Sequence, residues 1–195
     1  MKVAAFFGSP RIGGNTDILL QEALKPVKAA GHEVVQYTLN VMNIKPCQDC
    51  GGCTKTGVCV VNDAMKEVYE TIRTFDRFII ASPIFFYSVS AQTKAMIDRC
   101  QSFWCEKYLL KKDIPAGPHG RKGLLLVCAG MKKDDATRCA DTVAKIFFRT
   151  ISVPTHEMVS ALGVEDKGDI LSRAEALHEA FEAGKRLVEQ HTERH

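Results

Sequence analysis

Short apolar segments rich in β-branched residues alternate along the chain with longer amphipathic stretches. The apolar segments predict five strands, at Lys2–Phe7, Glu33–Thr38, Arg77–Ala81, Gly123–Cys128 and Val153–Val159. In the amphipathic stretches apolar residues recur at spacings of three and four, which predicts one buried face per helix. The five predicted helices span Thr16–Ala30, Asp63–Thr74, Ser90–Trp104, Asp135–Thr150 and Asp169–Gln190. The predicted apolar face of the last helix consists of Ile170, Ala174, Leu177, Phe181, Gly184 and Val188.

Strict alternation of strand and helix indicates right-handed βαβ units and a parallel sheet covered on both faces. We therefore predict the α/β class, as a doubly wound three-layer sandwich with a five-stranded parallel sheet of order 2-1-3-4-5. The length of 195 residues suits a single domain, residues 1–195. Two connections, at 39–62 and 105–122, are long for such a fold, and loops of that length are usually functional.

Composition argues against several classes of protein. The net charge is +3, with acidic and basic residues mixed along the chain, so no one-sided basic patch indicates a nucleic-acid partner. No apolar run approaches the roughly 18 residues of a membrane span, and the first apolar run is too short for a signal peptide. We therefore expect no membrane association and a cytoplasmic location. In such a reducing compartment clustered cysteines are more often metal ligands or redox groups than structural disulfides.

The first strand runs directly into GSPRIGGNT, Gly8–Thr16, and then into a helix. Ser9, Asn15 and Thr16 offer polar donors, the glycines allow close backbone approach, and Arg11 adds a charge suited to phosphate. The helix start supplies further N–H groups. The spacing matches neither a Walker loop nor a dinucleotide fingerprint, which favours a mononucleotide phosphate. The alternative is a polar turn that only caps the helix.

The segment PCQDCGGCTKTGVC holds Cys47, Cys50, Cys53 and Cys59 in the spacing C-x2-C-x2-C-x5-C. Such short gaps let consecutive thiolates surround one small cluster, which favours a [4Fe–4S] cluster with these four ligands. Structural zinc commonly uses two separated pairs, and a redox disulfide needs only two cysteines. Both alternatives stay open, as does a loop without a metal. The remaining cysteines are expected to be small buried residues outside any metal site, at Cys100, Cys105, Cys128 and Cys139.

Three segments together resemble a known family. GSPRIGGNT resembles the phosphate loop of the flavodoxin-like, NAD(P)H-dependent FMN reductase superfamily. ASPIFFYSVSAQTKAMIDR, Ala81–Arg99, resembles its flavin-ring loop and the helix that follows. CQSFWCEKYLL, together with the compact cysteine loop, is similar to the iron–sulfur flavoprotein branch. The resemblance covers roughly residues 1–130 and implies a flavodoxin-like fold.

The resemblance also implies FMN as a cofactor. It assigns the FMN phosphate to Ser9, Arg11, Asn15 and Thr16. The isoalloxazine ring would lie against Pro83, Ile84, Phe85 and Phe86, with Ser82 and Ser88 supporting that loop. Ala129 and Gly130 would form the third side of the pocket.

By the same resemblance the protein would be an FMN-dependent oxidoreductase that passes electrons between a [4Fe–4S] cluster and FMN. Its redox partner would be NAD(P)H or a ferredoxin-like donor, its acceptor a small molecule, and its assembly a homodimer or homotetramer. Two alternatives stay open. One is a cluster-free NAD(P)H-dependent FMN or quinone reductase, and the other is a flavin-binding module with a zinc-stabilised loop.

Overall fold

The computed structural model describes residues 1–133 and 135–189 and contains one mainly parallel sheet. Five parallel strands lie in the order β2-β1-β3-β5-β6, which confirms the predicted order of the five strands. Their bounds are Lys2–Phe7 for β1, Glu33–Thr38 for β2, Arg77–Phe85 for β3, Lys122–Ala129 for β5 and Thr155–Leu162 for β6. A two-residue strand that the sequence did not predict, β4 at Ser88–Val89, pairs antiparallel with the end of β3.

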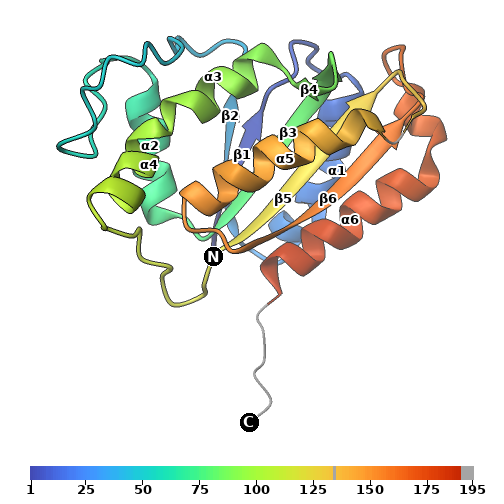
Figure 1. Ribbon diagram of the computed structural model, residues 1–195. Coiled ribbons are helices and arrows are strands. Elements are labelled where there is room, and N and C mark those ends of the chain that lie inside the picture. Colours follow the sequence, from blue (N-terminus) through green and yellow to red (C-terminus); the bar gives the residue numbers. More distant parts are fainter. Residues whose placement is uncertain (134, 190–195) are drawn as a thin grey trace.

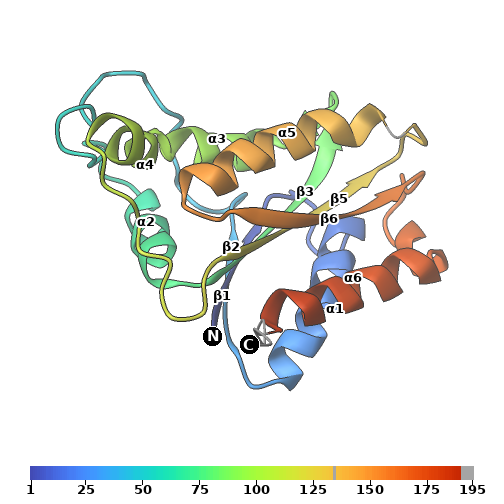
Figure 2. The ribbon, with the colours of Figure 1, turned by 60° about the horizontal axis from the view of Figure 1, so that its bottom comes forward.

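Helices cover both faces of the sheet, as Figures 1 and 2 show. The helix α1 (Asn15–Ala29) and the helix α6 (Ala174–Val188), with the short 3-10 turn Asp169–Ser172 between β6 and α6, lie on one face. The other face carries α2 (Met65–Thr74), α3 (Ala91–Arg99), α4 (Gln101–Trp104) and α5 (Asp135–Thr150). A π-helical turn, Cys105–Leu109, directly continues α4. Among the helices that the structure describes, none combines the length and apolar character needed to cross a bilayer.

The two layers of helices enclose two apolar cores, separated by the alternation of side chains along the strands. In β1, Ala4 and Phe6 pack toward α2, α3 and α5, whereas Val3, Ala5 and Phe7 pack toward α1 and α6. All five of these side chains are buried. A continuous apolar strand in the sequence therefore reflects burial on both faces.

The helices α1 and α6 approach each other closely at Gly184. A Cβ atom at this position would lie 1.9 Å from the carbonyl oxygen of Ala23 in α1. The buried face of α6 consists of Ala180, Ala183, Gly184, Leu187 and Val188. The predicted face was therefore only partly right, because Ala174 is exposed and Phe181 is half-buried. Its predicted first residue is also wrong, since Asp169–Ser172 forms a separate 3-10 turn.

Several predicted bounds differ from the structure. The strand β3 continues beyond Ala81 to Phe85, because its pairing with β5 extends to Pro83 and a hairpin to β4 follows. The predicted helix over residues 90–104 is divided into α3 and α4 at Cys100. The strand β6 begins after Pro154, which has no N–H group to donate to β5. The predicted end of the last helix, Gln190, lies outside the described residues.

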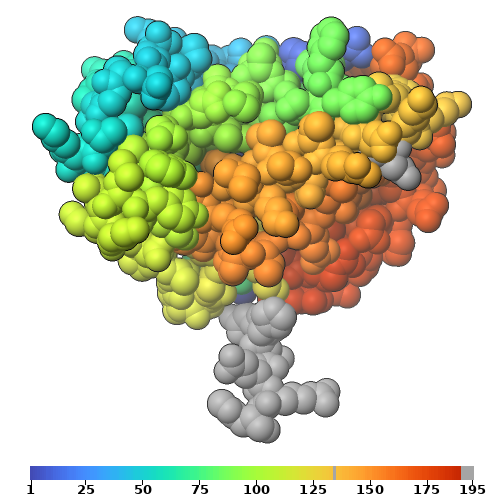
Figure 3. Space-filling view, viewed as in Figure 1, coloured from blue at the N-terminus to red at the C-terminus, as the bar shows by residue number. Residues whose placement is uncertain are grey.

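The fold brings two groups of loops to the surface. The loops that follow β1, β3 and β5 leave the same edge of the sheet, because the three strands are parallel neighbours. The loop between β2 and α2, residues 39–64, runs beside α3 and α4 at the upper left of Figure 1. In Figure 3 the tip of the β3–β4 hairpin protrudes at the top of the molecule, and this cysteine-bearing loop covers the adjacent corner.

Candidate functional site

The loop after β1 leads into α1, whose first turn has no side-chain cap. Gly14, the residue before α1, provides no side-chain hydrogen bond to the first turn. The N–H groups of a first helical turn have no acceptor inside the helix, so they are free to bind an anion. Gly13 has a φ of 68°, which only glycine adopts easily, and its N–H donates to the Asp17 carboxylate at 2.8 Å. Ser9 is buried, and its Oγ accepts the N–H of Arg11 at 3.1 Å.

Two polar side chains of this loop hold the loop that follows β6. Asn15 Nδ2 donates to the carbonyl of Asp166 at 2.8 Å, and Asn15 Oδ1 accepts the N–H groups of Gly168 and Ile170. Arg11 Nη1 donates to the carbonyl of Glu165 at 3.2 Å. The amide of Asn15 therefore has a structural task here, so any contact from this residue to an anion would come from its backbone N–H.

One cavity at the carboxyl edge of the sheet collects most of the residues predicted for the mononucleotide. Those that line it are Ser9, Arg11, Asn15, Thr16, Pro83, Ile84, Phe85, Ala129 and Gly130. Val164 and Glu165 also line the cavity, and the sequence analysis did not include them. A signal for them exists in the sequence. Val164 and Glu165 lie between Gly163 and Gly168, directly after the last predicted strand, which is β6 in the structure. The carboxyl ends of neighbouring parallel strands lie at the same edge of the sheet, so this loop was a candidate for the site.

The other three predicted residues lie in the β3–β4 hairpin outside this cavity lining. Ser82 is buried and its Oγ accepts the N–H of Ser90 at 2.9 Å, which ties the two ends of the hairpin together. Ser88 pairs with Phe85 in the short antiparallel ladder. Phe86 stands at the tip and is fully exposed.

The hairpin tip has an unusual backbone. Phe86 and Tyr87 have φ angles of 49° and 65°, so two bulky residues adopt left-handed conformations in one turn. This combination matches the mirror-image turns of two-residue hairpins, which normally use Asn or Gly there. Such strain costs on the order of 1–3 kcal/mol per residue and is most common at functional sites. The tip presents Phe85 and Phe86 to solvent beside the cavity.

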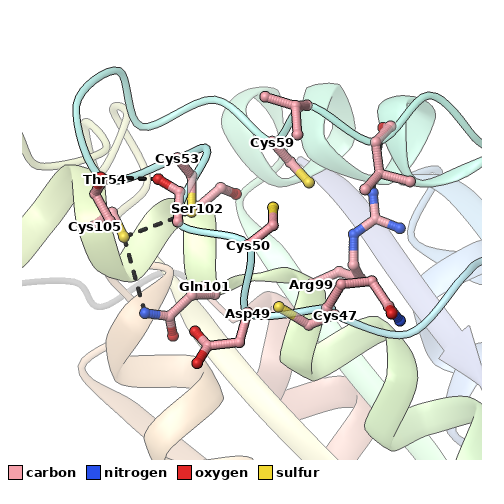
Figure 4. A pocket seen from close by; sticks show the side chains of 14 residues that line it. Cys47, Asp49, Cys50, Cys53, Thr54, Cys59, Arg99, Gln101, Ser102 and Cys105 are labelled. Atoms are coloured by element: carbon pink, nitrogen blue, oxygen red, sulfur yellow. Dashed lines mark hydrogen bonds between the residues drawn. The ribbon is translucent and has the colours of Figure 1, made fainter.

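The cysteine loop encloses a second, smaller cavity of about 40 Å³, shown in Figure 4. Cys47, Cys50, Cys53 and Cys59 all line it, together with Cys105. In Figure 4 the side chains of Cys47, Cys50 and Cys59 point into one shared space, whereas Cys53 lies beside Cys105. Within residues 1–133 and 135–189, no three Cys, His, Asp or Glu side chains are close enough together to hold a metal ion.

The expectation for the other four cysteines was partly wrong. Cys100, Cys105 and Cys128 are buried as predicted, but Cys139 is exposed. Cys105 is not a remote core residue, because its Sγ lies 3.6 Å from the Sγ of Cys53. The sequence held no periodic signal for this contact, since the two residues are far apart along the chain.

The thiols of the cavity differ in how readily they ionise. Burial, together with the neighbouring Cys105 thiol, raises the pKa of Cys53 to about 11. Burial alone would also raise the pKa of Cys59. Hydrogen bonds from the Val61 backbone and from Tyr69, with the charge of Arg99, outweigh it and lower this pKa. Metal ligands must be thiolates, so Arg99 favours the ligating form of Cys59.

Arg99, the last residue of α3, fixes both ends of the cysteine loop. Its buried guanidinium donates to the carbonyl of Lys45 at 2.9 Å, before the first cysteine, and to the carbonyl of Val61 at 3.4 Å, after the last. It also forms a buried pair with Asp63, in which both side chains are 1% exposed. The loop between these points contains Asp49, Gly51 and Gly57 at positive φ, so its course is tightly curled.

The donor set therefore fits a thiophilic metal or an iron–sulfur cluster in its chemistry. Four thiols from one short segment, anchored at both ends by Arg99, line one cavity, and the pKa of one of them, Cys59, is lowered. The space of about 40 Å³ is enough for only a few water molecules. Binding a cluster would require the segment 47–59 to rearrange so that all four sulfurs face the same centre.

Comparison with known proteins points to one family. The family described as NADPH-dependent FMN reductase matches residues 1–164. An iron-sulfur flavoprotein of Methanosarcina thermophila is 34% identical over 116 residues, which are 60% of this chain and 61% of the relative. An iron-sulfur flavoprotein of Methanocaldococcus jannaschii is 30% identical over 155 residues, 79% of this chain and 74% of the relative. The matched regions span 51–61% of the length of the first four curated relatives.

Solved structures share the fold. An NAD(P)H:quinone oxidoreductase from Methanothermobacter marburgensis superimposes with a TM-score of 0.72 at 20% identity, covering 98% of each chain. An FMN-dependent NADH-azoreductase from Bacillus anthracis, solved in complex with FMN, gives a TM-score of 0.69 at 15% identity and covers 97% of this chain and all of that one. At this level of identity the similarity establishes the flavodoxin-like fold.

Proposed function

The chain belongs to the NADPH-dependent FMN reductase family, in its iron–sulfur flavoprotein branch, and we propose that it is an oxidoreductase that passes electrons between a [4Fe–4S] cluster and FMN. One observation carries the flavin part of this proposal. Four segments far apart in the sequence line a single cavity: the loop after β1, the end of β3, the end of β5 and the loop after β6. They meet at the edge where ligands bind in doubly wound sheets.

In this proposal the phosphate of FMN lies at the uncapped start of α1. Ser9, Thr16 and the backbone N–H of Asn15 donate to it, and the Arg11 guanidinium balances its charge. Pro83, Ile84 and Phe85 form an apolar wall for the ring, opposite Ala129 and Gly130. Ser82 and Ser88 hold that wall in place, and Phe86 at the tip covers its outer end. When bound, FMN supplies two-electron chemistry that can also proceed in single-electron steps.

The cluster would be held by Cys47, Cys50, Cys53 and Cys59. When bound it supplies one-electron transfer. The contribution of the chain is the anchor at Arg99, which holds both ends of the segment and favours the Cys59 thiolate. The names of the archaeal relatives and the five thiols at one cavity support this assignment.

The remaining features of the proposal follow the family. NAD(P)H or a ferredoxin-like protein would be the redox partner and a small molecule the acceptor, with no nucleic acid or membrane involved. The chain would act in the cytoplasm as a homodimer or homotetramer of single domains, residues 1–195, with the cysteine loop inserted at 39–62.

Protein prepared and kept without oxygen tests the proposal directly. We expect flavin absorbance together with about four irons and four sulfides per chain. Cys50→Ser should lose iron and sulfide but keep FMN, whereas the matched control Cys139→Ser, at an exposed cysteine outside the loop, should keep both. Flavin without iron or sulfide, even after reconstitution, would contradict the cluster assignment.

The flavin site is tested separately. Arg11→Ala should weaken FMN binding by about 1.5–3 kcal/mol, the scale of a hydrogen bond to a charged group. Binding of riboflavin, which has no phosphate, should be nearly unchanged. Equal FMN affinity in the two proteins would place the phosphate elsewhere.

A second candidate, a cluster-free NAD(P)H-dependent FMN or quinone reductase, is favoured by the arrangement of the thiols. Within the described residues the four sulfurs are not gathered around one centre. This function predicts rapid NAD(P)H oxidation by iron-free, FMN-loaded protein with a quinone acceptor. Stoichiometric zinc in the same preparation would instead favour the zinc-stabilised flavin-binding module.

A further inference from the structure

Two cysteines 52 residues apart in the sequence lie side by side at the cysteine cavity. The Sγ atoms of Cys53 and Cys105 are 3.6 Å apart. Cys105 is fully buried, whereas Cys53 is half-buried and lines the cavity. Figure 4 shows the pair at one end of the cavity, away from the space shared by the other three loop cysteines.

Both residues are held in place by their own segments. Cys105 begins the π-helical turn after α4, a local geometry common at functional sites, and Gln101 Nε2 lies 3.8 Å from its Sγ. The carbonyl of Cys53 accepts the N–H of Gly57 at 2.8 Å. Gly57 packs so tightly on Glu106 that an added Cβ would lie 3.0 Å from the Cβ of Glu106.

Glu106 is itself fixed, because Arg73 of α2 donates to both of its carboxylate oxygens, at 3.2 and 2.7 Å. The turn Cys53–Gly57 therefore packs against Glu106, the residue that follows Cys105. The position of one sulfur relative to the other is set by packing on both sides.

We propose that Cys53 and Cys105 form a reversible intramolecular disulfide in the cluster-free protein. The oxidant is a low-molecular-weight disulfide that reaches the half-buried Cys53 from solvent. Cys53 attacks one sulfur of this disulfide and forms a mixed disulfide, releasing one thiol. Cys105 then attacks the Cys53 sulfur, releasing a second thiol, so the two protein thiols lose two hydrogens and the oxidant gains them. The sulfurs must close from 3.6 Å to the bonded distance of about 2.05 Å.

The pairing rests only on this geometry, but its consequence rests on the proposed function. A disulfide would remove Cys53 from the four proposed cluster ligands. The same cavity would then hold either a cluster or a disulfide, and oxidation of the empty site would block cluster insertion until a reductant restores both thiols.

The test uses the full chain, freed of iron with a chelator and treated with oxidised glutathione. The reaction is stopped with acid, free thiols are alkylated after unfolding, and the peptides are mapped by mass spectrometry. We expect Cys53 and Cys105 of the wild type to become unavailable for alkylation and to yield a linked pair of peptides containing these two residues. Dithiothreitol should restore both.

Two variants sharpen the result. In Cys105→Ser the link should disappear and Cys53 should carry glutathione. Cys100→Ser, the matched control at a buried cysteine in the neighbouring turn, should keep the link. If Cys105→Ser fails to fold, Cys53→Ser serves instead, and its Cys105 should remain fully alkylatable after oxidation. A wild type in which Cys105 stays free, or in which Cys53 pairs with another loop cysteine, would overturn the proposal.

Iron analysis separates this inference from the proposed cluster. Anaerobic Cys105→Ser should contain as much iron and sulfide as the wild type. A loss of iron in this variant would identify Cys105 as a cluster ligand and overturn its role as the disulfide partner. A wild type that never holds iron but forms the Cys53–Cys105 link would contradict the cluster alone.

Discussion

Replacing Asp63 by Asn should destabilise the protein strongly, because it leaves a buried guanidinium without its counter-charge. The Asp63 carboxylate accepts two hydrogen bonds from Arg99, and both side chains are 1% exposed. Removing one partner of a buried ion pair costs about 3–5 kcal/mol. The Nε of Arg99 already has no hydrogen-bond partner among the described residues, so the local structure offers little compensation. Against a total stability of about 5–15 kcal/mol, such a loss is large.

The assay is urea unfolding followed by far-ultraviolet circular dichroism, on iron-free protein at one fixed flavin occupancy. Asp98→Asn is the matched control, because Asp98 pairs with Lys94 on the surface at 41% and 46% exposure. An exposed pair of this kind contributes about 0–1 kcal/mol. The double variant Arg99→Met/Asp63→Leu should recover only part of the stability, because it removes both buried charges but leaves the backbone groups of Lys45, Val61 and Met65 without these partners. Equal losses for Asp63→Asn and Asp98→Asn would refute the reasoning.

The same pair predicts a dependence on pH. Burial alone would raise the pKa of Asp63, but hydrogen bonds from Arg99 and from the backbone of Lys45 and Met65 outweigh it and lower this pKa. A carboxylate with a lowered pKa contributes stability that is complete above its ordinary pKa and is lost as the pH falls through the lowered value. The difference in unfolding free energy between wild type and Asp63→Asn should therefore be constant near neutrality and shrink in acid. A difference that grows on acidification would show that the pair is not what stabilises the loop.

Two further predictions concern the flavin site and the packing of helices. Asn15→Ala removes three hydrogen bonds to the loop after β6. FMN binding should therefore weaken by about 1–3 kcal/mol, proteases should cleave the segment 163–170 faster, and the melting temperature should fall. An unchanged melting temperature would be evidence against this role of Asn15. Gly184→Ala should lower the melting temperature, because its Cβ would lie 1.9 Å from the Ala23 carbonyl oxygen and overpacking costs about 1–3 kcal/mol. The exposed Lys185→Ala on the same helix is the control, and a Gly184→Ala protein as stable as this control would contradict the close packing of α1 and α6.

The sequence by itself determined the layers of this protein and the edge of the sheet where its ligand cavity lies. Buried strands and amphipathic helices differ in their period, so their alternation predicted the strand order that the structure shows. Glycines and polar donors after the first strand marked the loop that lines the cavity at that edge, because parallel strands end on one side. Local patterns are sufficient for such features, since they depend on residues close in the chain.

Only the tertiary structure decided which distant residues share a site. Asn15 proved to hold a loop more than 150 residues away, and Arg99 to join the two ends of the cysteine segment. Cys105, expected to lie outside any metal site, lines the same cavity as the other thiols and contacts Cys53. These contacts depend on how helices and loops pack against each other in three dimensions. A periodic pattern reports which face of an element is buried, but not which residue of another element lies against it.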